Sequence, residues 1–143
     1  MNKFKTIQLK KAGFITCLFL CSTTCFAQKD WLTDSPLYQS YSQALNLQTD
    51  KSRSTLSEVK TPEQIYVASL NDALELLLTE DEIKFEKYED HYDTRLELLE
   101  KINPQTAGSL FATAEVRLQW AFVYLKFGHE LDAAWNVRQA YLT

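Results

Sequence analysis

Hydrophobic residues recur every three or four positions along most of the chain after residue 60, which is the period of an amphipathic helix. Only two of the three glycines follow residue 27, too few for a series of hairpin turns. We therefore predict an all-α fold. The predicted helices cover about 36–47, 62–78, 80–102, 109–127 and 130–142, and the polar run from residue 48 to residue 57 predicts a loop.

Local signals mark the predicted helix ends. Thr61-Pro62-Glu63-Gln64 is typical of a capping box with proline in the first turn, and Thr79-Glu80-Asp81-Glu82 repeats that pattern. Asn103-Pro104 ends the helix at 80–102, because proline disfavours helical geometry in the residue before it. Gly128 suits the left-handed residue that stops the helix at 109–127.

The apolar faces of these helices differ in width. Helix 62–78 carries Ile65, Ala68, Asp72 and Leu76 on a broad face, and helix 109–127 is apolar on most sides. The charged residues of helix 109–127, such as Glu115 and Arg117, argue against membrane burial. Because the apolar faces of both helices are broad, each helix is expected to pack against several other helices. Helix 130–142 has one apolar face, made of Leu131, Ala134, Trp135, Arg138 and Tyr141 or Leu142.

Residues 1–27 differ from the rest and predict an export signal. The segment begins with four lysines, Lys3, Lys5, Lys10 and Lys11, and contains no acid. The run from Ala12 to Cys21 is apolar except for Thr16, and a small residue, Ala27, ends the segment. This pattern predicts cleavage after Ala27 and delivery to the periplasm or beyond. The apolar run has about half the length that a membrane-spanning helix needs.

A lipid anchor is the weaker alternative. A bacterial lipoprotein keeps a leader cysteine as its first mature residue, preceded by Gly, Ala or Ser. Here Leu20 precedes Cys21, and Thr24 precedes Cys25. Free export without a lipid anchor is therefore favoured.

The charge and the cysteine content of residues 28–143 exclude several classes of function. Four of the 15 basic residues and none of the 19 acidic residues lie before Gln28, so residues 28–143 have a formal charge of −8. Such a surface repels the phosphate backbone, and nucleic acid is not expected as a partner. All three cysteines lie before residue 28, which excludes disulfides, thiolate zinc sites and cysteine nucleophiles from the exported part.

Small residues recur at intervals of twelve and seven near the end of the chain. They are Ala121, Ala133 and Ala140, with Tyr124 and Gly128 between them. Residues 114–141 thereby resemble one tetratricopeptide repeat, a family in which small residues lie where helices approach most closely. The chain departs from the pattern at Arg117, where the family often has tryptophan, and at Val137, which replaces an aromatic residue.

The resemblance implies antiparallel hairpins stacked as an α–α superhelix over 61–143, after a signal peptide at 1–27 and a short helix with a polar linker at 28–60. Repeats of this kind bury a continuous core only by stacking, and about three are normally needed. Three arrangements satisfy this requirement. Helix 36–47 folds back as a third layer, another molecule covers the terminal face, including self-association through the last helix, or the chain is the front part of a longer array.

Candidate chemistry is sparse. His91 shares its helix face with Lys87, Tyr88, Thr94 and Arg95 rather than with carboxylates, so a surface or half-buried histidine is expected instead of a metal ligand. His129 is expected at a helix start. The run Glu80-Asp81-Glu82 lacks the spacing of a calcium loop. No nucleophile elbow, phosphate loop, dinucleotide fingerprint or zinc-binding His pair occurs, and no cofactor is predicted.

Two functions fit the exported, all-α character. The leading hypothesis is a non-enzymatic scaffold that binds a protein or peptide, as the resemblance implies. Its ligand would lie along the first helices of successive hairpins, 62–78 and 109–127, whose polar residues include Gln64, Asn71, Gln119 and Lys126. The alternative is a peptidoglycan-cleaving enzyme with one glutamate of raised pKa, for which Glu75 and Glu115 are the candidates. The Glu-Ser pair typical of such enzymes is absent.

Overall fold

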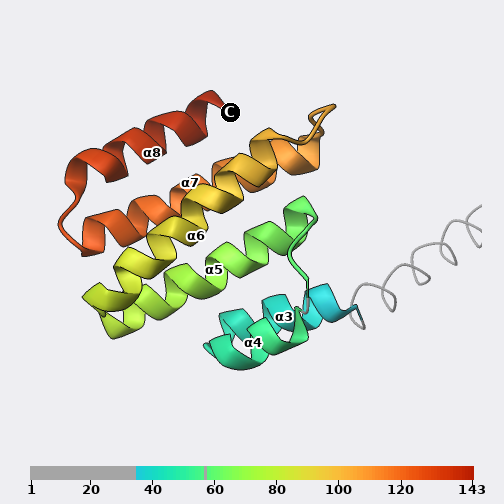
Figure 1. The fold of residues 1–143 in the computed structure, drawn as a ribbon, viewed down its shortest axis with the longest axis horizontal. Coiled ribbons are helices and arrows are strands. Elements are labelled where there is room, and N and C mark those ends of the chain that lie inside the picture. Colours follow the sequence, from blue (N-terminus) through green and yellow to red (C-terminus); the bar gives the residue numbers. More distant parts are fainter. Residues whose placement is uncertain (1–34, 57) are drawn as a thin grey trace, which may run out of the picture. The chain divides into compact units, whose positions relative to one another are not determined.

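The computed structural model describes residues 35–56 and 58–143, and no strand occurs in this part of the chain. The all-α prediction is confirmed. The predicted signal peptide at 1–27 lies outside the described residues. The helices, labelled as in Figure 1, are α3 (Pro36–Leu45), α4 (Thr49–Thr55), α5 (Pro62–Thr79), α6 (Glu82–Glu100), α7 (Ala107–Lys126) and α8 (Glu130–Leu142).

The predicted loop at 48–57 is wrong, because residues 49–55 form α4. Leu47 has a φ of 59°, a left-handed conformation that turns the chain tightly between α3 and α4. The resulting hairpin buries Ser52 and brings Arg53 against α5. These tertiary contacts stabilise a helix that its polar sequence only weakly favours.

The capping prediction for α5 is confirmed and the one for α6 is wrong. At α5, the Thr61 side chain accepts from the Gln64 amide while the Gln64 side chain accepts from the Thr61 amide, and Pro62 occupies the first turn. At α6, Asp81 is the cap and accepts from the amides of residues 83 and 84. Thr79 instead ends α5, where its hydroxyl donates to the Glu75 carbonyl.

Helix α7 begins two residues before the predicted start, because Thr106 forms a second capping box with Ser109. The predicted stop after α7 is confirmed: Gly128 has a φ of 78°. Only glycine adopts this conformation readily, which allows the chain to turn into α8. His129 is the residue before α8, but its side chain makes no capping hydrogen bond.

The core lies among α5, α6, α7 and α8. Helix α7 packs against all three of the other helices, and α5 also packs against α3 and α4 (Figure 1). The Trp120 ring is fully buried and stacks on Tyr92 at a centroid distance of 4.7 Å. The Tyr92 hydroxyl donates to Asn136 on α8, which ties α6 to the last helix. Burying large aromatic side chains supplies much of the stability of such a core.

Helices α3 and α4 form a separate, smaller layer on α5. Its apolar contacts gather around Leu56, Val67 and Ala68, apart from the main core. The sequence analysis offered three arrangements, in one of which the helix predicted at 36–47 folds back as a further layer. That helix, α3, does fold back, and it packs on α5. Within the described residues, α8 packs mainly against α7 and is also joined to α6 by the hydrogen bond between Tyr92 and Asn136.

Candidate functional site

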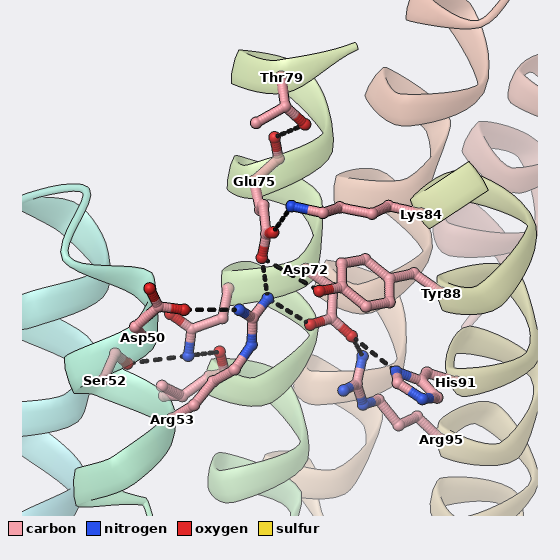
Figure 2. A network of polar contacts seen from close by, with 12 residues as sticks. Asp50, Ser52, Arg53, Asp72, Glu75, Thr79, Lys84, Tyr88, His91 and Arg95 are labelled. Atoms are coloured by element: carbon pink, nitrogen blue, oxygen red, sulfur yellow. Dashed lines mark hydrogen bonds and ion pairs between the residues drawn. The ribbon is translucent and has the colours of Figure 1, made fainter. Parts of the chain in front are cut away.

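Asp72 is a buried carboxylate at the centre of a charged cluster. Its side chain is 3% exposed, on the α5 face that the sequence assigns to the apolar stripe. Arg53 of α4 donates to Oδ1 at 2.9 Å, and from α6 the Arg95 Nη1 and His91 Nδ1 atoms lie 2.7 and 3.3 Å from Oδ2 (Figure 2). A carboxylate this deeply buried needs compensating charge, and the two arginines supply it.

Glu75 lies one turn further along α5 and extends the cluster (Figure 2). Lys84 donates to Oε1 at 2.6 Å, while Arg53 Nη2 and the Tyr88 hydroxyl lie 2.6 and 3.1 Å from Oε2. Burial by itself raises the pKa of Glu75, but the hydrogen bonds from Lys84 and Arg53 outweigh it and leave the pKa below its ordinary value. The expectation of a raised pKa at Glu75 is therefore wrong.

Glu115, the other acid considered for catalysis, is half-buried on α7. Its charge acts on Tyr66 across the α5–α7 contact: burial and the neighbouring Tyr41 raise the pKa of Tyr66 to about 12, and Glu115 adds to this shift. Glu75 and Glu115 lie on different helices and are not joined by a hydrogen bond in the described part of the chain.

A second polar cluster lies beside the first and joins α3, α4 and α5. The Ser52 hydroxyl donates to the Ser40 carbonyl at 2.7 Å, and the Asn71 amide donates to the Ser52 hydroxyl at 2.8 Å. All three side chains are fully buried. Asn71, named in the sequence analysis as a polar residue of a predicted ligand-binding helix, is thus an interior residue that fixes the α3–α4 hairpin on α5.

The other three polar residues considered for ligand binding are Gln64, Gln119 and Lys126, and each lies in a different local environment. Gln64 belongs to the α5 capping box, and Lys126 pairs with Glu80 at 2.6 Å. The side-chain amide of Gln119 is buried without a hydrogen-bond partner in the described part of the chain. These residues are not brought together into one site.

A pocket of about 340 Å³ opens beside Asp72, between α4, α5 and α6. Its charged lining includes Arg53, Lys87 and Arg95, with His91 beside them. A neighbouring hollow of about 250 Å³ shares Arg95, His91 and Val59 with the pocket and extends to Leu98. His91 thus lies at a pocket edge, and no group of three or more potential metal ligands occurs among the described residues.

The second candidate surface is on α8. Small Ala133 and polar Asn136 are the buried residues of this helix. The opposite side carries Leu131, Trp135, Arg138 and Leu142, which we call the α8 outer face. Leu131 is 87% and Trp135 54% exposed, so the large apolar residues point away from α7. The Arg138 guanidinium lies 5.6 Å from the centroid of the Trp135 ring.

The residues named for the repeat resemblance occupy the α7–α8 hairpin. Ala121, Tyr124 and Ala133 are buried, Ala140 is half-buried, and Gly128 forms the turn. The Tyr124 hydroxyl also donates to Glu89 of α6 at 2.9 Å. Small side chains at Ala121 and Ala133 allow the two helices to approach closely.

Arg53 is the residue of this charged cluster that the sequence interpretation missed. It lies in the polar run taken for a loop. Besides the nearby Asp50, its acidic partners are Asp72 and Glu75, which are 19 and 22 positions away in the sequence. The one usable signal is Asp72, since a carboxylate on an otherwise apolar helix face requires a buried cationic partner.

Comparisons with known proteins add no further assignment. No protein-family model, curated protein or solved structure matches the chain significantly. None of the described helices combines the length and the apolar character needed to cross a membrane.

Proposed function

We propose that this chain is an exported helical-repeat scaffold that binds a protein or peptide partner. The observation that carries the proposal is the α8 outer face, where Leu131 and Trp135 are exposed on a helix whose other side is packed. Clustered exposed apolar side chains on soluble domains commonly mark interaction sites. Tryptophan and arginine, here adjacent at Trp135 and Arg138, are the residue types most enriched among binding hot spots.

The resemblance to a tetratricopeptide repeat supports the same proposal. The α7–α8 hairpin has its small residues at the helix contact and a left-handed glycine in its turn, as the resemblance implies. Proteins of that family are scaffolds whose stacked helices present side chains to a partner. A partner helix, or the same helix of a second copy, would cover the apolar residues of the α8 outer face.

The binding test begins with a library of random peptides displayed against the purified protein. The affinity of a selected peptide is then measured by fluorescence anisotropy. Trp135→Ser is expected to weaken binding about tenfold or more, as loss of an aromatic hot spot does. The matched control is Ile83→Ser, because Ile83 is also a large apolar residue, 82% exposed, but lies on α6.

Both variants should unfold at the temperature of the parent protein, since each replaces an exposed side chain. Equal losses of affinity in both variants, or failure to select any peptide, would contradict the proposal. Hydrolysis of cell-wall glycan by the purified protein would point to the enzymatic alternative instead.

Export is a separate part of the proposal and has its own test. The lysine-rich start, the apolar run and Ala27 predict a mature chain that begins at Gln28. Amino-terminal sequencing of the protein recovered from the cell envelope or the medium should return Gln28 as the first residue. Recovery of the uncleaved chain from the cytoplasm would refute export without affecting the binding surface.

A further inference from the structure

Arg95 has more hydrogen-bonding capacity than its surroundings use. Its side chain is only 13% exposed, and its Nη1 atom lies 2.7 Å from Asp72 Oδ2. Nη1 thus forms an ion pair with the Asp72 carboxylate. Within the described residues, the Nε and Nη2 atoms of this guanidinium donate no hydrogen bond, so their N–H groups are available to a ligand.

The pocket beside Arg95 also carries an excess of positive charge. Its lining includes three permanent cations, Arg53, Lys87 and Arg95, but only one carboxylate, Asp72. Arg53 is further neutralised by Glu75, whereas Lys87 forms no ion pair in the described part of the chain. The unbalanced charge therefore lies on α6, at Lys87 and Arg95. This local excess contrasts with the formal charge of −4 of the whole chain.

The rest of the lining combines apolar residues with Tyr88 and His91 of α6. Leu56, Val59 and Ala68 form the wall opposite α6, and the neighbouring hollow continues to Leu98. A volume of about 340 Å³ admits a group of a few non-hydrogen atoms with its hydration displaced. The cationic residues favour binding of a negatively charged oxygen group, and the apolar wall favours an aliphatic group attached to it.

We propose that the pocket between α4, α5 and α6 binds a carboxylate borne on a short aliphatic group, with Arg95 as its main donor and Lys87 as a second cation. A guanidinium matches the two oxygens of a carboxylate in one plane. A carboxylate fits better than a dianionic phosphate, because Asp72 is already present and because the wall is apolar. The site is separate from the α8 outer face and does not depend on the proposed scaffold function.

The test uses protein purified from cells that express the whole chain. N-acetyl-L-leucine, which has a free carboxylate, is compared with N-acetyl-L-leucinamide, which has the same aliphatic group without the charge. Binding is followed by NMR chemical-shift titration of the arginine side-chain and backbone N–H signals. The acid is expected to bind with a dissociation constant in the millimolar range, as small ligands do, and the amide at least tenfold more weakly.

Two variants separate loss of the site from loss of the fold. Arg95→Gln should weaken binding of the acid about tenfold, the effect of losing a charge-assisted contact. Lys87→Gln replaces an exposed lysine without an ion pair, so it should keep the parent's stability and still weaken binding about threefold. Lys101→Gln changes an exposed lysine just after the end of α6, outside the pocket lining; it is the control and should leave the affinity unchanged.

Three further probes identify the source of the carboxylate and the limits of the site. If N-acetyl-L-glutamic acid α-amide binds more tightly than N-acetyl-L-leucine, the carboxylate comes from an acidic side chain; the reverse order points to a peptide C-terminus. Equal binding of the acid and the amide would overturn the proposal. So would tighter binding of inorganic phosphate, or the absence of any titration with the acid up to about 10 mM.

Discussion

Asp72→Asn should strongly destabilise the fold, because one carboxylate balances two arginines. The substitution keeps the shape of the side chain and removes its charge. Arg53 would keep its contact with Glu75 at 2.6 Å, but Arg95 has no other acidic partner among the described residues. The loss therefore falls mainly on Arg95, whose side chain is 13% exposed.

The size of this effect follows from the burial of the pair. Removing one partner of a buried ion pair costs about 3–5 kcal/mol, because the other charge stays buried without compensation. Since Arg95 reaches some solvent, we expect a loss of about 3 kcal/mol in the free energy of unfolding. That is a large part of the roughly 5–15 kcal/mol by which small domains are stable.

Urea unfolding followed by circular dichroism measures this loss. The comparison holds when the free energy of unfolding falls with urea concentration at the same slope in the variant and the parent. The control is Glu97→Gln, which breaks the exposed pair with Lys101 and should cost less than about 1 kcal/mol. In the Asp72→Asn protein, replacing Arg95 by Met should recover part of the stability, since it removes the uncompensated charge. A loss at Asp72→Asn no larger than that of the control would refute the reasoning.

Three further predictions concern pH and backbone conformation. Burial alone would raise the pKa of Glu75, but hydrogen bonds from Lys84 and Arg53 outweigh it and hold the pKa below 4.5. The Glu75 carboxylate therefore stabilises the fold above pH 4.5, and this stabilisation is lost as the pH falls through the lowered pKa. The difference in the free energy of unfolding between the parent and Glu75→Gln, measured by urea unfolding, should shrink over the same pH range. Burial raises the pKa of Tyr92 to about 12, so the parent should lose stability as the pH rises from 10 towards 12, and Tyr92→Phe should lose about 2 kcal/mol less over that range. Gly128→Ala should cost about 1 kcal/mol in thermal unfolding, because the φ of 78° is unfavourable for alanine while its added Cβ meets no atom within 4 Å; an unchanged melting temperature would contradict this account.

Much of the fold could be predicted from residues close together in the sequence. The capping box at Thr61 and Gln64 and the left-handed stop at Gly128 both occur as predicted. Each depends on contacts within about four residues, so the local sequence contains the information. The start of α6 was misplaced because Thr79 and Asp81 both suit a helix cap, and Asp81 is the residue that takes that position.

The candidate sites depend on contacts that local patterns do not encode. The polar segment around Arg53 becomes helix α4 because α3 and α5 provide partners for Ser52 and Arg53. Likewise, Asn71 is polar on a helical wheel but is buried by the α3–α4 hairpin. A pattern of polar positions predicts exposure only when no other element of the chain covers that face.

By itself, the sequence determined that this protein is helical and where most of its helices begin and end, since helix periodicity and capping are interactions between near neighbours. Tertiary structure decided which faces are covered. Asp72 meets Arg53 and Arg95 from helices 19 and 23 positions away, and α8 packs through Ala133 while Trp135 stays exposed. Both outcomes follow from how closely whole helices approach, because burial and charge pairing are properties of the packed assembly rather than of any one segment.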